Sequence, residues 1–270
     1  MARAQPAAGI ELLTDEEFRQ YQQEGHLVVE GALSSSEVDR VVERLREYTH
    51  GDRDAPFETM LEPSVTEGDA DVAHEGDAVR KFEGLDMVRE DDVFHDLAHH
   101  ETVVRVAQDL LGPHLKLLRS AAMLKPPNVG SEKGLHQDAA YYPIRPRDHV
   151  TVWIALDEAT PTNGCMTVVP GAHMDGLTEH STVDYDTDIL IRDSPYDEGD
   201  FIELPMEAGD ALFTHCLMPH RTAPNTTDSW RRASINAYMT ARSRFTEPPE
   251  ERAPYVDSEP ITGASFPGCV

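Results

Sequence analysis

Cysteine is scarce in this sequence, and its spacing argues against two common kinds of site. Only Cys165, Cys216 and Cys269 are present, and no CxxC pair occurs. An odd number without paired spacing argues against a disulfide framework and against a structural zinc site. Cys165 and Cys216 lie in apolar runs, so we expect them to be buried as small hydrophobic side chains.

Long hydrophobic runs are missing as well. The longest, such as VWIAL at 152–156, fall far short of the roughly 20 residues that a membrane-spanning helix needs. The opening MARAQPAAGIELL lacks the basic and then apolar pattern of a secretory signal. We therefore expect a cytoplasmic protein that has no membrane partner.

Positive charge is low, and lysine is especially rare. The chain has 23 basic residues against 50 acidic ones, a formal net charge of −27, and only four of the basic residues are lysines. Such a charge repels nucleic acid and anionic membrane surfaces. An acidic, lysine-poor surface is typical of proteins in a high-salt cytoplasm, where screening removes the self-repulsion. We therefore hypothesise a halophilic origin, which loss of activity in molar KCl would contradict.

Hydrophobic residues make up 39% of the 270 residues, which is enough to build a core, and the length suits a single domain. The first part is typical of helices. Ranges 14–25 and 34–51 each begin with a capping box, Thr14 with Glu17 and Ser34 with Glu37. Range 91–111 predicts a further helix, whereas the acidic range 52–78 has no pattern and predicts a surface loop.

From about residue 115 the pattern changes to short strands separated by turns. Segments such as VTVWIALD alternate apolar and polar residues, and PTNG and PGAH are turn signals. Many short strands predict a mainly β fold, and a jelly roll fits their number. We expect mostly helical support over 14–112, a jelly-roll core over 115–245, and an acidic, proline-rich tail over 246–270, all within one domain.

A histidine and a carboxylate lie two residues apart in LHQDAAYY. Side chains two apart on a strand point to the same side, so His136 and Asp138 can face the inside of the barrel together, with Gln137 facing away. The pair offers one nitrogen and one oxygen ligand to a metal. HxD alone is weak evidence, because a solvated pair at the end of a strand has the same pattern.

His220 is the candidate for a third ligand. It begins a strand, and Arg231 follows eleven residues later at the start of the last strand, after the turn-forming APNTTDSW. An antiparallel hairpin would bring Arg231 near His220, with Thr222 on the same face. A guanidinium binds a carboxylate by two parallel hydrogen bonds, so this wall suits a metal and a carboxylate-bearing ligand.

The remaining candidates in this half of the chain are expected to have lesser roles. We expect His149 and His180 at the surface, His173 at a turn, and His215 in the core or behind the ligands. Tyr141 and Tyr142 are expected to pack or to line the mouth of the site. Arg119 and Arg145 face either the substrate or the solvent.

Two histidines and one carboxylate on one side of a metal form the facial triad of non-haem Fe(II) oxygenases. The segments 135–173, with HQD, NGC and PGAH, and 209–234, with HRT and RR, carry these residues. In order and spacing they resemble the phytanoyl-CoA dioxygenase family of Fe(II)/2-oxoglutarate oxygenases, over about residues 15–245. The resemblance implies a double-stranded β-helix with flanking helices.

The resemblance also implies roles for individual residues. His136, Asp138 and His220 resemble the iron ligands, and Arg231 with Thr222 resembles the anchor of the distal carboxylate of 2-oxoglutarate. Trp153, Gln137 and Lys81 also match co-substrate positions of the family, with Gln137 between the two ligands. The alternative interpretations are that Trp153 is only a core residue and that Lys81 is only a surface lysine. The implied cofactors are Fe(II), 2-oxoglutarate and O2.

The implied reaction is hydroxylation or desaturation of an unactivated C–H, with release of succinate and CO2. Halogenating relatives lack the carboxylate that Asp138 supplies here. Two other readings stay open: a cupin-like isomerase or hydrolase with another metal, and a non-catalytic metal-binding barrel. We expect a small-molecule substrate, no nucleic-acid partner, and a monomer or homodimer. Acidic lid loops at 52–78 and 174–200 would favour a neutral or cationic substrate.

Overall fold

The structure is a computed structural model of the chain, and it describes residues 12–51, 53–182, 189–248, 251, 257–264 and 266. The first eleven residues, to which most of the signal-sequence prediction applies, lie outside these ranges. So do Cys269, part of the predicted lid at 174–200 and much of the predicted tail.

The two helices predicted from capping boxes are confirmed. These are α1 (Asp15–Glu24) and α2 (Ser35–Thr49), and in each the cap side chain and the glutamate three residues later exchange hydrogen bonds with the backbone. The helix predicted over 91–111 is instead two helices, α5 (Asp92–Ala98) and α6 (Glu101–Leu111), which separate at His99 and His100.

The range 52–78 is more ordered than predicted, in the part that the structure describes. It contains strand β2 (Glu58–Leu61), the short helix α3 (Pro63–Thr66) and the 3-10 turn η1 (Glu75–Ala78). Strand β2 pairs with β3 (Val79–Glu83), and the short helix α4 (Asp86–Glu90) follows. Sequence pattern missed β2 because its stability depends on a partner strand rather than on its own residues.

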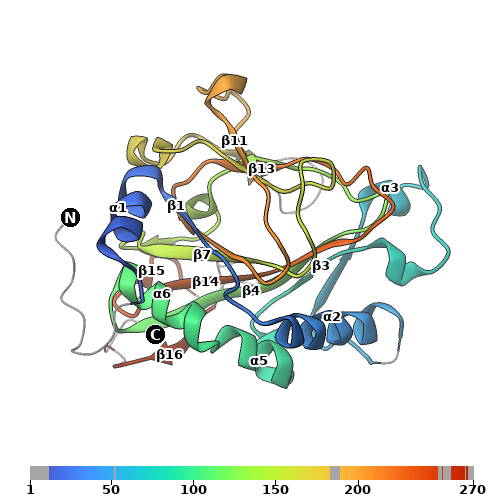
Figure 1. Cartoon of the computed structure of the whole chain (residues 1–270), viewed down its shortest axis with the longest axis horizontal. Coiled ribbons are helices and arrows are strands. Elements are labelled where there is room, and N and C mark those ends of the chain that lie inside the picture. Colours follow the sequence, from blue (N-terminus) through green and yellow to red (C-terminus); the bar gives the residue numbers. More distant parts are fainter. Residues whose placement is uncertain are drawn as a thin grey trace.

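One large antiparallel sheet, with eight strands among the described residues, is the main sheet of the structure. Its strands are joined in the order β1-β12-β7-β14-β4-β3-β2, and β16 is added at β4. Helices α2, α5 and α6 lie along one side of this sheet (Figure 1). The bounds not yet given are β1 (His26–Val29), β4 (Leu115–Lys125), β7 (His149–Ala155), β12 (Ala211–His215), β14 (Arg231–Thr240) and β16 (Glu259–Thr262).

A smaller antiparallel sheet lies on the other side of the large one. Its order is β11 (Ile202–Leu204), β8 (Met166–Val168), β13 (His220–Thr222) and β5 (Lys133–His136). Two sheets of this kind make a double-stranded β-helix, as predicted (Figure 1). Two ribbons complete the described strands: β9 (Ser181–Thr182) with β10 (Ile189–Leu190), and β6 (Ile144–Arg145) with β15 (Arg244–Phe245).

The division into helical support, jelly-roll core and tail stays a prediction. Strands from the support range and from the tail range also join the large sheet of the core. The helical range also contributes β1, β2 and β3 to the large sheet, and the tail range contributes β16, which pairs with β4. Among the described residues, no helix combines the length and apolar character that crossing a membrane demands. Cys165 and Cys216 are buried and unbridged, as expected.

Strand β7 shows how one strand serves two cores. Val150, Val152 and Ile154 pack in the cluster between the sheet and the helices. Trp153 instead packs in the cluster between the two sheets, and Thr151 points into the cavity there. The two-residue period of a strand separates these roles.

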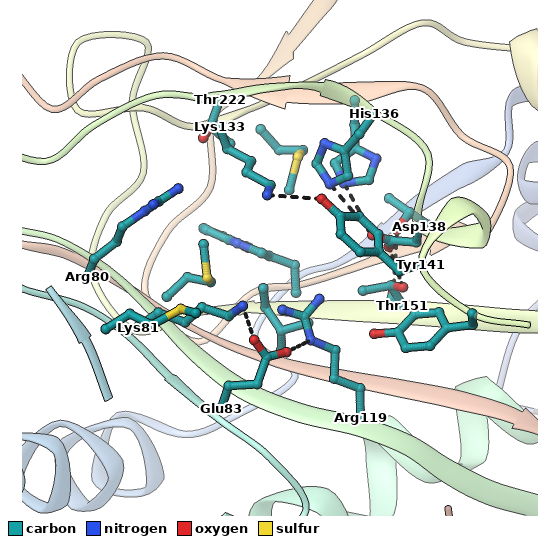
Figure 2. Close-up of a pocket in the computed structure, with 18 of the residues that line it drawn as sticks. Arg80, Lys81, Glu83, Arg119, Lys133, His136, Asp138, Tyr141, Thr151 and Thr222 are labelled. Atoms are coloured by element: carbon teal, nitrogen blue, oxygen red, sulfur yellow. Dashed lines mark hydrogen bonds and ion pairs between the residues drawn. The ribbon is translucent and has the colours of Figure 1, made fainter. Parts of the chain in front are cut away.

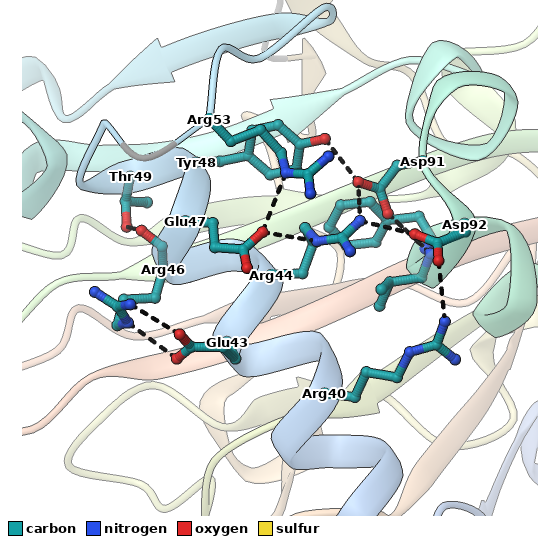
Figure 3. A network of polar contacts seen from close by, with 12 residues as sticks. Arg40, Glu43, Arg44, Arg46, Glu47, Tyr48, Thr49, Arg53, Asp91 and Asp92 are labelled. Atoms are coloured by element: carbon teal, nitrogen blue, oxygen red, sulfur yellow. Dashed lines mark hydrogen bonds and ion pairs between the residues drawn. The ribbon is translucent and has the colours of Figure 1, made fainter.

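A network of charges fastens α2 to the N-terminus of α5 (Figure 3). Asp91 caps α5, since its Oδ1 accepts a hydrogen bond from the Val93 amide at 2.9 Å. Its Oδ2 accepts hydrogen bonds from Arg44 and from the Tyr48 hydroxyl, at 2.7 Å for Tyr48. Burial acts to raise the pKa of Asp91, but the bonds from Arg44 and Tyr48 outweigh it and lower the pKa.

We expect Asp91→Asn to reduce the free energy of unfolding by roughly 2–3 kcal/mol, because it removes the buried charge that accepts hydrogen bonds from Tyr48 and Arg44. Arg44 keeps its ion pairs with Glu47 and Asp92. A carboxyl group whose pKa is lower in the folded state stabilises the fold at pH values above its unfolded-state pKa of about 3.9. This stabilisation is lost as the pH falls through the folded-state pKa. Urea unfolding should therefore show the difference at pH 7 and its decline in acid. Asp92→Asn is the control, since that side chain is 72% exposed and should matter little. Equal losses in both variants would contradict the prediction.

Candidate metal centre and co-substrate site

A cavity between the two sheets contains most of the predicted site residues (Figure 2). It encloses about 900 Å³ of space, its open mouth included. The small sheet contributes His136 and His220 to its wall, and the large sheet contributes Trp153 and Arg231. Residues distant in the sequence therefore meet in one chamber.

The three predicted ligands lie together. One candidate ligand atom from each of His136, Asp138 and His220 lies within 4.8 Å of the others, and all three residues are buried. The Asp138 Oδ1 is 3.7 Å from the His136 Nε2 and 3.8 Å from the His220 Nε2. The two histidines are adjacent because β13 pairs with β5 with His220 opposite His136.

Asp138 reaches this site by a different route from the one predicted. Strand β5 ends at His136, and Asp138 begins the 3-10 turn η2 (Asp138–Ala140). The shared direction of His136 and Asp138 thus does not come from strand alternation. The turn is held by the Ala139 amide, which donates to the Cys216 carbonyl at 2.9 Å.

Hydrogen bonds determine which nitrogen of each histidine can bind a metal. The Nδ1 of His136 is 2.8 Å from the Gly134 carbonyl, and the Nδ1 of His220 is 2.9 Å from the Met218 carbonyl. A carbonyl can only accept, so each Nδ1 carries the proton and, in a neutral ring, Nε2 keeps its lone pair. Burial holds the pKa of His136 well below its ordinary value, which keeps that ring neutral.

The carboxylate of Asp138 is ionised and oriented. Burial opposes its charge, but His220, His136 and a hydrogen bond from Thr151 outweigh burial and lower its pKa. The Thr151 hydroxyl donates to Oδ2 at 2.6 Å. Because Oδ2 is occupied, Oδ1 is the oxygen that faces both histidines and is the one available to a metal.

Arg231 faces the cavity, but not through the predicted hairpin. Strands β13 and β14 belong to different sheets, and Arg231 pairs with Lys125 on β4 rather than with any residue near His220. Arg231 and His220 are brought to one cavity because the two sheets face each other. Arg232 points away, and its guanidinium forms two hydrogen bonds with Asp157.

The Arg231 side chain shows that this cavity fits an anion. It is only 2% exposed, and its Nε and Nη1 have no hydrogen-bond partner among the described residues. The guanidinium lies 5.3 Å from the centre of the Trp153 ring. Burial lowers the pKa of Arg231 to about 10, so the group remains charged at neutral pH. A buried, unpaired charge is costly, and a carboxylate would satisfy it.

The other predicted co-substrate residues divide into two groups. Thr222, Trp153 and Lys81 line the cavity. Gln137 is fully buried outside the cavity wall, where its side chain donates to the carbonyls of Gly176 and Leu217 and accepts from the Thr178 amide. Gln137 therefore supports a loop, and its position does not suit contact with the co-substrate.

The lesser predictions have mixed outcomes. His149 is buried on β7, so its predicted surface position is wrong. Arg145 is exposed and does not line the cavity, so of its two predicted positions it takes the solvent-facing one. His180 is half-buried, and its Nε2 accepts a hydrogen bond from the Gln137 amide. His215 lies outside the ligand cluster, as expected, with its ring 5.0 Å from that of His173.

Sequence reasoning missed five further polar residues of the cavity wall, Arg80, Glu83, Lys133, Thr151 and Thr214. Strand alternation could have found Thr151, because it shares the inward face of β7 with Trp153. No local signal identified Lys133, which lies in the turn-rich stretch KPPNVGSEKG three residues before His136.

Two histidines and one carboxylate, with the remaining positions of the metal left open, are the arrangement that non-haem iron oxygenases use. A jelly roll that also carries a buried arginine beside this group places the protein in the iron- and 2-oxoglutarate-dependent oxygenase class. Comparison with known proteins identifies the family within that class.

Residues 21–233 match the family model described as phytanoyl-CoA dioxygenase (PhyH), and the chain belongs to this family. It is 29% identical over 275 residues to phytanoyl-CoA dioxygenase domain-containing protein 1 of Danio rerio, covering 88% of this chain and 94% of that protein. It is 26% identical over 246 residues to the peroxisomal phytanoyl-CoA dioxygenase of Homo sapiens, covering 87% and 71%. The chain is thus an oxidoreductase whose cofactors are iron and 2-oxoglutarate, as expected.

Solved structures share the fold. EctD from S. alaskensis, with 2-oxoglutarate and 5-hydroxyectoine, superimposes with a TM-score of 0.72 at 20% identity, covering 94% of this chain and 86% of that chain. The epimerase SnoN, in complex with Fe3+, alpha ketoglutarate and nogalamycin RO, gives 0.68 at 23% identity, covering 92% and 95%. These similarities confirm the double-stranded β-helix.

Proposed function

We propose that this protein hydroxylates or desaturates an unactivated C–H bond of a small organic substrate. In this proposal His136, Asp138 and His220 hold iron(II), and Arg231 holds the distal carboxylate of 2-oxoglutarate. The observation that carries it is the unpaired, buried guanidinium of Arg231 in the same cavity as the three ligands. Neither a cupin-like hydrolase nor a non-catalytic barrel requires this group.

Each residue has a physical task in this scheme. The Nε2 atoms of the two histidines and the Oδ1 of Asp138 would hold the iron, which would supply the oxidising chemistry. Arg231 binds one end of the co-substrate from the large sheet, and the Thr222 hydroxyl, on the facing small sheet of the same cavity, adds a hydrogen bond. Bound iron, with 2-oxoglutarate and dioxygen, supplies the oxidising power and releases succinate and CO2.

The cavity wall protects this chemistry from water. Trp153 is buried, its ring centre lies 5.3 Å from the Arg231 guanidinium, and it belongs with Met166 to the apolar cluster between the sheets. Exclusion of water strengthens the pairing between the guanidinium and a carboxylate. Trp153 therefore serves the pocket as well as the core. A contact between Lys81 and the co-substrate stays a prediction, as do the cytoplasmic location and the oligomeric state.

The test is a turnover screen in which purified protein, iron(II) and 2-oxoglutarate are exposed to air with a metabolite library and succinate is measured. We expect some compounds to raise succinate release together with dioxygen uptake, and omission of iron or 2-oxoglutarate to stop it. Substrate conversion that persists without 2-oxoglutarate would instead support the isomerase or hydrolase reading.

Thr151 should affect the affinity for iron(II) although it is not one of the three ligands. Thr151→Val keeps the shape of the side chain but removes the hydrogen bond to Asp138 Oδ2, so the carboxylate is free to turn. Loss of such an outer partner typically weakens metal binding by about 10- to 100-fold. Calorimetric titration with iron(II) under nitrogen should show this, and Thr151→Ser should restore most of the affinity. Equal affinity in Thr151→Val and the unaltered protein would contradict the role.

A further inference from the structure

The cavity has the opposite charge to the chain. The protein carries a formal net charge of −27, yet five basic side chains and two acidic ones line this chamber. These are Arg80, Lys81, Arg119, Lys133 and Arg231, against Glu83 and Asp138. Collecting so many of the scarce basic residues in one place indicates a charged ligand.

One wall carries a triad of two cations and one anion. The Arg119 Nε donates to Glu83 Oε1 at 2.7 Å, and the Lys81 ammonium forms an ion pair with Glu83 Oε2. Glu83 is buried, so both cations are held in position (Figure 2). The group retains a net charge of +1, and the Arg119 side chain points from it into the cavity (Figure 2).

A further cation extends from the small sheet. Lys133 begins β5, and its Nζ donates to the Tyr141 hydroxyl at 3.1 Å (Figure 2). That hydroxyl also accepts a hydrogen bond from the Ile189 amide at 3.1 Å. The Lys133 ammonium is thereby held at the cavity wall, with the Tyr141 ring below it at 5.5 Å.

Iron and the co-substrate do not neutralise this charge. The two positive charges of iron(II) offset the two negative charges of 2-oxoglutarate, so the sum over the cavity wall is unchanged when both are bound. It stays positive even without Arg80, which also faces the Glu62 carboxylate. A cavity wall whose side chains carry a net positive charge is stabilised by a bound anion.

We propose that the substrate is an organic anion, and that its carboxylate or phosphate group binds between Arg119 and Lys133. The wall also carries the apolar side chains of Met60, Met123, Met166 and Ile235, which suit an apolar body. This inference rests on the proposed function and identifies its substrate class. The acidic ranges 52–78 and 174–200 do not set the charge of the cavity wall, because Met60 is the only one of their described residues that lines it.

The test measures binding by calorimetry under nitrogen, with iron(II) and 2-oxoglutarate present so that no turnover begins. The probes are straight-chain carboxylates, with the alkyl phosphate, amide and amine of each length. We expect an anion to bind about tenfold or more tightly than its amide, the effect of one charged hydrogen bond. Tighter binding of phosphates than of carboxylates would identify a phosphate ester, and the reverse a carboxylic acid.

Substitutions test which side chains account for the preference for an anion over its amide. Arg119→Gln and Lys133→Gln should each reduce anion binding by about tenfold and leave amide binding unchanged. Glu83→Gln should strengthen anion binding, because it removes the one negative charge between Lys81 and Arg119. Because Glu83→Gln should strengthen anion binding rather than weaken it, this variant still tests the proposal if Arg119→Gln fails to fold. Arg145→Gln is the matched control, an exposed arginine outside the cavity, and should change nothing.

Amides or amines that bind the unaltered protein as tightly as the anions do would overturn the inference, as would binding of no anion at all. Failure of the proposed function gives a different result, because the unaltered protein would then not bind 2-oxoglutarate together with iron. Titration of 2-oxoglutarate into each variant separates the two outcomes.

Discussion

Replacement of His136, Asp138 or His220 by alanine should each abolish turnover while the fold survives. Each change removes one of the three atoms that face the metal, and no other described His, Cys, Asp or Glu joins this cluster. The loss in iron(II) affinity should exceed the roughly 10- to 100-fold that loss of an outer partner costs. Metal titration and 2-oxoglutarate turnover measure the effect, and circular dichroism checks the fold.

His215→Ala is the control for these three variants. Its ring packs near His173 and Tyr21 and is not among the three ligands. It should retain more activity than His220→Ala and bind iron normally. Full activity of any alanine variant of the three, after metal reconstitution, would exclude that residue as a ligand.

Arg231→Lys should raise the apparent KM for 2-oxoglutarate by about 10- to 100-fold. Lysine keeps the charge but cannot form the two parallel hydrogen bonds of a guanidinium with a carboxylate. Charged hydrogen bonds contribute roughly 1.5–3 kcal/mol, and each 1.4 kcal/mol is about tenfold in affinity. Iron binding in the absence of 2-oxoglutarate should hardly change, because Arg231 lies outside the ligand cluster.

Arg232→Lys is the matched control on the same strand. Arg232 faces the opposite side and pairs with Asp157, so its replacement should alter the KM for 2-oxoglutarate little. An unchanged KM in Arg231→Lys would show that the co-substrate carboxylate is held elsewhere. Saturation kinetics at fixed substrate concentration, with succinate as the product measured, distinguishes these results.

Features that depend on neighbouring residues could be predicted from the sequence. The caps at Thr14 and Ser34 involve residues three apart, so α1 and α2 were predicted correctly. Strand β7 was predicted because alternation is visible within one segment. The cluster of His136, Asp138 and His220 was predicted because His136 and Asp138 are close in the chain and because His220 begins a strand eleven residues before Arg231. The family resemblance then agreed with this choice.

Features that depend on strand partners could not be predicted in this way. The sequence does not show that His220 pairs with His136, or that β13 and β14 lie in opposite sheets, and the predicted hairpin was therefore wrong. The charge of the cavity has the same origin. Glu83, Arg119 and Lys133 come from three strands, and only the assembled sheets bring them together.

The acidic exterior and the basic cavity act on an anionic substrate over different ranges. Repulsion by the exterior extends over many ångströms and is screened within about 10 Å at 0.1 M salt, whereas contacts in a buried cavity are screened much less. Added salt would thus speed the approach of the substrate while it leaves the bound contacts largely intact. Such an enzyme would capture its substrate faster in concentrated electrolyte than in dilute buffer, the reverse of the usual electrostatic steering.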